Sequence, residues 1–276
     1  MSLALTLQTP PAVPLEAEVL SPARLAGLSA QDAAKLPVIH GNQRADLGDF
    51  FQVAGTADGE LHVTGDLSRV KFIGAGMAEG RVVVHGPAGM HLGAGMTGGE
   101  IVVEGDAGDW VGLEMAGGRI VVKGNAGHMV GAAPRGSSIG MLGGEIIVSG
   151  NAGNETGNGM RRGLIAIGGD AGDFTSVNAI AGTVIVLGHI GWRAGAGMKR
   201  ASIVAMHPAE LLPTFTYDCT YAPLFLRLYL RHLRGLGLAV ADQQLVGLYQ
   251  RWSGDSVALN RGEVLLLQSG DGAREG

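Results

Sequence analysis

The sequence predicts an all-β fold: a right-handed parallel β-helix of about seven 19-residue coils with α-containing terminal caps. Glycines recur 19 residues apart, as at Gly86, Gly105 and Gly124, within a repeated unit G-x-x-G-x-x-x-G. A β-prone run such as "RVVVH", "EIVVE" or "RIVVK" precedes each first glycine. A unit of this length is too short for a strand and a crossover helix, but it suffices for three short strands and three corners.

The composition agrees with this fold and excludes several classes of protein. Of 276 residues, 48 are glycine, more than twice the number expected from an average usage of about 7%. The net charge of −5 gives no reason to expect nucleic acid as a partner. No apolar run of about 18 residues predicts a membrane span, and the first residues do not resemble a signal peptide. The single cysteine, Cys219, indicates a reducing compartment, so we expect a cytoplasmic protein.

Three segments are expected along the chain. Residues 1–58 form an N-terminal capping segment, residues 59–205 form the β-helix, and residues 206–276 form a C-terminal segment with a helix near 223–234. Between Gly124 and Gly150 the glycine spacing grows to 26, so seven inserted residues near "GAAPRGSSIG" are expected to form a loop.

Within each coil, alternation predicts which side chains point inward. Pairs such as Val82 and Val84, or Ile101 and Val103, should stack as core ladders. A methionine column on the same spacing is interpreted as core packing: Met77, Met96, Met115, Met141, Met160 and Met198. We attribute the recurring glycines to positive φ at the corners. Acids and asparagines after the first glycine are interpreted as turn formers that bond their own backbone: Asp106, Asn125, Asn151 and Asp170.

No catalytic or metal-binding pattern stands out. The spacing Gly93-x-Gly95-x-x-Gly98 matches a dinucleotide-binding turn, but no strand–turn–helix surrounds it and its glycines belong to the repeat, so the match is accidental. The eight histidines show no metal-ligand spacing and no acidic neighbour in sequence. We therefore expect neither a catalytic residue nor a metal site on this chain.

The middle residue of each strand should face outward, yet these positions are apolar. This apolar strip consists of Val83, Val102, Val121, Ile147, Ala166 and Ile185. Contiguous exposed apolar surface marks contacts. The strip is therefore covered either by the chain's own termini or by a partner.

Basic side chains provide candidate contacts for a polyanionic chain or an acidic partner, with a solvated surface as the alternative. Arg161, Arg162, Lys199 and Arg200 occupy the same corner two coils apart, and Arg135 lies in the inserted loop. On the expected C-terminal helix, Arg227, Arg231 and Arg234 share one face.

With this repeat and the "GAGM" variants at 74–77, 93–96 and 195–198, the chain resembles the C-type subunit of formylmethanofuran dehydrogenase. The repeat is similar also to the C-terminal β-helix of the glutamate synthase large subunit. Outside the repeat, "SPARLAGLSAQDAAKLPVIHGNQRADLGDFFQVAG" and "RWSGDSVALNRGEVLL" resemble the flanks of the C-type subunit. The resemblance to the C-type subunit therefore extends over nearly the whole chain.

The resemblance implies a non-catalytic scaffold subunit of a bacterial formyltransferase/hydrolase complex, in which formaldehyde is oxidised to formate. A formyl group would pass from tetrahydromethanopterin to a methanofuran-type carrier with a glutamyl tail. The implied partners are formyltransferase and amidohydrolase-like subunits, and no cofactor would bind tightly to this chain. Alternatives are the C-type subunit of a methanogen-type molybdenum or tungsten enzyme and a glutamate-synthase-like domain. A β-helix acyltransferase or anhydrase would show an 18-residue period and zinc-spaced histidines, and a carbohydrate-binding β-helix would need more aromatic side chains.

Overall fold

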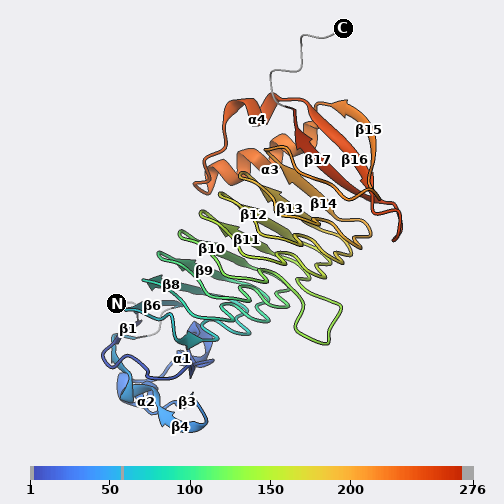
Figure 1. Cartoon of the computed structure of the whole chain (residues 1–276). Coiled ribbons are helices and arrows are strands. Elements are labelled where there is room, and N and C mark those ends of the chain that lie inside the picture. The colour runs from blue at the N-terminus through green and yellow to red at the C-terminus, as the bar shows by residue number, and fades with distance from the viewer. Residues whose placement is uncertain (1–2, 57–58, 269–276) are drawn as a thin grey trace.

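Seven stacked strands form the middle of the chain, each following the last by one turn of the backbone (Figure 1). The computed structural model describes residues 3–56 and 59–268. Residues 1–2, 57–58 and 269–276, which fall in the expected terminal segments, lie outside the described residues. The stacked strands are β8 (Arg81–His85), β9 (Glu100–Val103), β10 (Arg119–Val122), β11 (Glu145–Val148), β12 (Leu164–Ile167), β13 (Thr183–Val186) and β14 (Ser202–Ala205).

The N-terminal elements gather at one end of this stack (Figure 1). The strand β1 (Leu3–Leu7) pairs in parallel with β6 (Glu60–Thr64), which in turn pairs with β8. The remaining elements are β2 (Leu15–Glu16), α1 (Pro22–Leu25), α2 (Ala30–Ala34), β3 (Pro37–His40), β4 (Gln43–Asp46), the 3₁₀ turn Leu47–Asp49, β5 (Phe51–Ala54) and β7 (Val70–Lys71).

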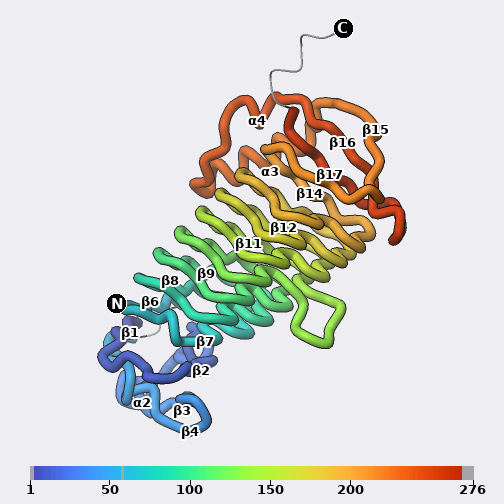
Figure 2. The backbone as a smooth tube through the Cα atoms, in the orientation of Figure 1, coloured from blue at the N-terminus to red at the C-terminus, as the bar shows by residue number. Residues whose placement is uncertain are grey.

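The C-terminal elements lie at the other end of the stack (Figure 2). They are β15 (Thr216–Tyr221), α3 (Leu224–Gly235), α4 (Asp242–Val246), β16 (Tyr249–Gly254) and β17 (Gly262–Leu267). The last strand, β17, pairs in parallel with β14 and so continues the stack, whereas β16 and β15 add to it in antiparallel fashion.

One sheet therefore joins both ends. Its strand order is β15-β16-β17-β14-β13-β12-β11-β10-β9-β8-β6-β1-β5, and a second sheet has the order β4-β3-β2-β7. Most pairs in the large sheet are parallel and helices are few, as in a β-helix-like all-β fold. Single-residue bridges along Ala88, Ala107 and Ala126 form a second row of contacts between successive turns.

The core follows the ladders that alternation predicts. Val82, Ile101, Ile120 and Ile146 stand in register and are fully buried. The methionine column is also buried, with no member more than 1% exposed, so the core interpretation of these side chains is confirmed. The inserted residues leave the stack after Ala133 without regular structure and return at Gly140, as the wider glycine spacing predicts.

The explanation of the glycines by positive φ is wrong for the second glycine of each repeat and for the first glycine from Gly105 onward. The third glycine, as at Gly112 (φ +66°), has a left-handed backbone, and among the first glycines Gly86 (φ +146°) also has a positive φ. The first, as at Gly124, would place a Cβ 2.2 Å from Oδ1 of Asp106 and 2.8 Å from the backbone N of Asp106. The second, as at Gly127, would meet Asp109 equally closely. These glycines are needed because neighbouring turns approach closely. Between the second and third glycines, non-glycine residues such as Trp110 (φ 58°) adopt the left-handed backbone conformation.

The turn-forming acids also act differently from the sequence interpretation. Oδ1 of Asp106 accepts a hydrogen bond from the backbone N–H of Asn125, one turn further on, at 2.7 Å. Asn125 and Asn151 accept from the following turns in the same way, at 2.9 and 2.8 Å. These side chains therefore tie successive turns together where the backbone bends away from the strand ladder.

Candidate functional site

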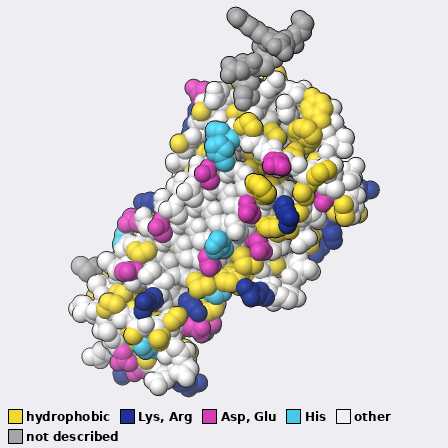
Figure 3. All heavy atoms as spheres, viewed as in Figure 1, with side chains coloured by type: hydrophobic (Ala, Val, Ile, Leu, Met, Phe, Trp, Pro, Cys, Tyr) yellow, Lys and Arg dark blue, Asp and Glu magenta, His cyan; other side chains and the backbone are white. Residues whose placement is uncertain are grey.

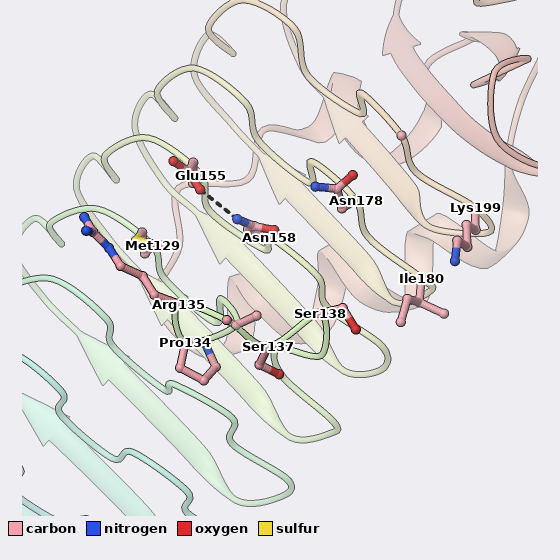
Figure 4. Close-up of a pocket in the computed structure, with 13 residues that line it drawn as sticks. Met129, Pro134, Arg135, Ser137, Ser138, Glu155, Asn158, Asn178, Ile180 and Lys199 are labelled. Carbon is pink, nitrogen blue, oxygen red and sulfur yellow. Dashed lines mark hydrogen bonds between the residues drawn. The ribbon is translucent and has the colours of Figure 1, made fainter.

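The inserted loop forms one wall of a groove beside the stacked turns (Figure 4). Two backbone hydrogen bonds anchor the loop to the next turn, from Ala133 N–H to Asn158 O at 2.9 Å and from Gly140 N–H to Gly159 O at 2.8 Å. The groove encloses about 660 Å³. Its walls comprise Met129, Ala133, Pro134, Arg135, Gly136, Ser137, Ser138, Glu155, Asn158, Asn178, Ile180, Gly197 and Lys199.

The structure brings two of the predicted basic residues to this groove. Arg135 comes from the inserted loop, and Lys199 comes from the turn before β14 (Figure 4). The amide of Asn158 is oriented by a hydrogen bond from its Nδ2 to Oε2 of Glu155 at 2.7 Å, while Asn178 is exposed. Hydroxyl, amide and cationic groups therefore line this groove together with the carboxylate of Glu155, and its two cations offer contacts to an anionic ligand.

Four of the predicted cations share one edge of the stack, which we call the basic edge: Arg161, Arg162, Lys199 and Arg200. Arg161, Ile180 and Lys199 donate their backbone N–H groups to the turn before them in the same way, so Arg161 and Lys199 lie two turns apart. At about 4.8 Å per turn this is roughly 10 Å. All four side chains are exposed. Within residues 3–56 and 59–268, none of them forms an ion pair.

The three arginines of α3 have different surroundings. Arg234 donates from Nε and Nη2 to the carbonyl oxygen of Val240, at 2.9 and 2.6 Å, and pairs with Asp242. Arg234 therefore holds the chain that follows α3. Arg227 and Arg231 take part in no ion pair among the described residues, so these two remain candidates for external contacts.

The predicted apolar strip is covered over part of its length by the chain itself. Ile147, Ala166 and Ile185 are fully buried in a cluster with Leu226, Leu230 and Leu233 of α3. Val121 packs at the margin of this cluster and Val102 is half-buried, whereas Val83 is 6% exposed. Of the two alternatives, the C-terminal segment therefore covers the half of the strip that lies under α3.

Histidines pair with acids from a neighbouring turn, between α3 and the strands, and within one strand, where Nε2 of His62 lies 3.6 Å from Glu60. The expectation that no histidine has an acidic neighbour in sequence is therefore wrong for His62. Nδ1 of His85 lies 2.9 Å from Glu104, and Nε2 of His232 lies 2.9 Å from Glu145. A register of 19 residues would have revealed the pair of His85 and Glu104. Among the described residues, no group of three or more His, Cys, Asp or Glu side chains is arranged to hold a metal ion.

Shifted pKa values mark structural groups. Burial raises the pKa of Tyr249, whose hydroxyl donates to the carbonyl oxygen of Gln244 at 2.6 Å. Burial of Asp255 opposes its ionisation, but hydrogen bonds from the backbone N–H groups of Gly197 and Val257 outweigh burial and lower its pKa. Tyr249 thus joins β16 to α4, and Asp255 joins the segment after β16 to the turn before β14.

The surface seen in Figure 3 has a broad band of backbone and uncharged side chains across the stacked turns. Charged side chains border this band, and hydrophobic ones gather toward the end that carries β15 and β16. No helix in the described part of the chain is long and apolar enough to cross a membrane.

No family model matches the chain. The chain is 43% identical over 82 residues to the C-type subunit of molybdenum-containing formylmethanofuran dehydrogenase 1 from Methanothermobacter thermautotrophicus, a match covering 29% of this chain and 20% of that protein. The C-type subunit of the tungsten-containing formylmethanofuran dehydrogenase 2 from that organism is 40% identical over 93 residues, covering 32% of this chain and 34% of that protein. The matches thus span about a fifth to a third of these relatives.

A solved structure matches over almost the whole chain. It is the formyltransferase/hydrolase complex (FhcABCD) from Methylorubrum extorquens in complex with methylofuran, with a TM-score of 0.90 and 34% identity. The match covers 96% of this chain and 100% of that one. Fold and sequence together define the chain as a β-helix-like subunit of the kind found in one-carbon enzyme complexes. The chain belongs to the family of the C-type subunits of formylmethanofuran dehydrogenase.

Proposed function

We propose that the chain is a non-catalytic scaffold subunit of a formyltransferase/hydrolase complex that oxidises formaldehyde to formate. Its partners would be formyltransferase and amidohydrolase-like subunits, and the formyl group would pass from tetrahydromethanopterin to a methanofuran-type carrier. The observation that carries the proposal is the match to one complete chain of the FhcABCD complex, at a TM-score of 0.90. The exposed apolar and basic side chains of the described residues add support because they offer contacts to other subunits.

We propose the finer architecture on the same grounds: a right-handed parallel β-helix of about seven coils over residues 59–205, closed by α-containing caps formed by 1–58 and 206–276. The 19-residue register of the paired strands supports the coils. Cys219 as the one cysteine of the chain supports a cytoplasmic location.

The subunit role is tested by isolating the chain with its companions from its own cells. We expect a tagged chain to co-elute with formyltransferase and amidohydrolase-like subunits in constant ratio, and the chain expressed alone to show neither formyl transfer nor formate release. A chain that elutes alone from fresh extract, or that turns over formyl substrate after partners are removed, would contradict the proposal.

A second candidate is a methanogen-type formylmethanofuran dehydrogenase, which the curated relatives favour because they are subunits of molybdenum and tungsten enzymes. Metal analysis of the purified complex separates the two candidates. Stoichiometric molybdenum or tungsten would favour the dehydrogenase, and its lack would favour the formyltransferase/hydrolase.

For the basic edge we propose contact with the glutamyl tail of the carrier, with Arg135 and the groove beside it extending the same surface. The residues suit such a tail because four exposed cations lack ion-pair partners among the described residues and are about 10 Å apart in pairs, a distance that a few extended residues span. Exposed pairs are worth about 0–1 kcal/mol each, so the cluster as a whole should matter.

The test replaces all four residues of the basic edge by serine. We expect an assembled complex with less retained carrier than the parent at low ionic strength, and a difference that narrows at moderate ionic strength because salt screens the attraction exerted by the parent's cations. Equal carrier content at both ionic strengths would show that the edge is only solvated.

A further inference from the structure

A second groove lies along the flank of α3, away from the inserted loop. We call it the α3 groove, and it is formed by Gly144, Glu145, Gly163, Leu164, Leu228, Tyr229 and His232. It encloses about 580 Å³. Glycines and Leu164 from the beginnings of β11 and β12 form its floor, and the helix forms its wall.

The helix is apolar on two faces, of which the fold uses one. Leu226, Leu230 and Leu233 are buried against the strands. The four apolar side chains that remain exposed are Leu224 (67%), Phe225 (43%), Leu228 (71%) and Tyr229 (37%). Because residues four apart lie on the same side of a helix, Leu224 stands above Leu228 and Phe225 above Tyr229. A contiguous apolar flank of this kind marks a contact surface, whereas single exposed apolar residues do not.

The charges at the rim indicate what kind of partner fits. Arg162 directly precedes Gly163 of the floor, and Arg227 and Arg231 follow the helix beside Leu224 and Leu228. In the described part of the chain these three arginines form no ion pair.

The acid in the groove is already neutralised. Glu145 accepts from Nε of Arg119 at 2.9 Å and lies 2.9 Å from Nε2 of His232. The rim therefore carries uncompensated positive charge around an apolar centre, the complement of an apolar segment with acidic residues at its edges.

We propose that the α3 groove docks an apolar, acidic-edged segment of another subunit of the complex; this inference rests on the proposed function. A second copy of this chain fits poorly, because a symmetric contact brings the same arginines face to face. The groove gives the scaffold a particular place at which it holds a partner, and its rim meets the basic edge at Arg162.

The test places a photo-cross-linking benzoylphenylalanine at position 228 of the full-length chain and, as a control, at position 257, where Val257 is 80% exposed. Within the assembled complex we expect position 228 to cross-link to another subunit, at a segment with apolar and acidic residues. Position 257 should give no such product. A product joining two copies of this chain, or no product at position 228, would overturn the inference.

Charge and apolarity are tested separately in the same complex. With the cross-linker kept at position 228, Leu224→Asp should reduce the yield of the cross-linked partner at least tenfold, since a carboxylate then enters an apolar contact. Arg227→Glu with Arg231→Glu should reduce it as well, and Val257→Asp should not. The melting temperatures of all these variants must match that of the parent, so that a lower yield reports lost docking and not unfolding. Full partner yield with both groove variants overturns the docking site and leaves the subunit role standing, whereas a parent chain that never co-purifies with other subunits overturns both.

Discussion

Because α3 covers only part of the apolar strip, an acidic side chain should destabilise the fold by different amounts at equivalent positions of the repeat. Ile185 and Val102 occupy the same position in their strands, but Ile185 is fully buried beneath Leu226 and Leu230 while Val102 is half-buried. We predict that Ile185→Asp strongly destabilises the protein and that Val102→Asp has a small effect. The two variants introduce the same carboxyl group at equivalent positions, one buried and one half-buried.

The size of the effect can be worked out from the ionisation of the new carboxyl. At position 185 the group is buried within the hydrophobic cluster beneath α3, so we expect it to stay protonated in the folded protein. Holding a group of pKa about 3.9 neutral at pH 7 costs roughly 3.1 × 1.36, or about 4 kcal/mol. At position 102 water reaches the carboxylate, and we expect a loss of about 1 kcal/mol or less.

The pH dependence provides a second check, because the folded-state pKa at position 185 is raised above the unfolded value. The unfolded chain then binds fewer protons near neutral pH, so the stability of Ile185→Asp should rise as the pH falls from 7 toward 5. Urea unfolding at pH 5 and 7 measures both variants. Equal losses for Ile185→Asp and Val102→Asp, or a loss independent of pH, would refute the reasoning that α3 seals this part of the strip.

Two further predictions concern the stacked turns and the C-terminal end. Gly98→Ala should lower the free energy of unfolding by about 2–3 kcal/mol because its Cβ would lie 2.1 Å from a backbone carbonyl oxygen of the preceding turn. Gly76→Ala, with open space and φ +64°, should lower it by about 1 kcal/mol. Thermal unfolding that ranks the two variants equally would contradict the close-approach argument. Asp255 has a pKa below its unfolded value, so its stabilising contribution is present above pH about 4 and is lost as the pH falls through the folded-state pKa; Asp255→Asn should remove this part of the acid dependence, and an unchanged acid limb would show that other carboxyls cause it.

The ladders were predictable because register along a parallel stack is fixed by sequence period alone. Val82 and Ile101 are 19 residues apart, and alternation decides which of their faces is buried. The reason for each glycine was not predictable in this way. Whether Gly124 is needed for its backbone φ or for the close approach of a neighbouring turn depends on how far Asp106 reaches toward the next turn. The sequence period does not give this distance.

The candidate site was predictable to the extent that it follows the repeat. The two basic pairs share an edge because they hold the same position in their turns, two turns apart. The sequence analysis did not predict the α3 groove because it assigned contacts on this helix to the arginines alone. A helical projection of "LFLRLYLRHLRG" already contains two apolar stripes, Leu226 with Leu230 and Leu224 with Leu228. Which stripe faces the strands depends on tertiary packing.

Charge pairing along the stack explains why the basic edge is left available. At the beginnings of the strands the sign alternates from turn to turn, through Glu60, Arg81, Glu100, Arg119 and Glu145, and adjacent members lie 2.9–3.6 Å apart. Those charges form ion pairs with one another.

At the basic edge the turn between the two basic pairs carries Ile180 and Ala181 instead of charges, so an uncharged turn separates the pairs. Two like charges about 10 Å apart in water repel by only about 0.4 kcal/mol, which a fold tolerates easily. An anion that approaches one of them to about 4 Å gains about 1 kcal/mol, and more where the groove excludes water. Uncharged turns between charged ones thus preserve positive charge at little cost to the fold and keep it free for a ligand.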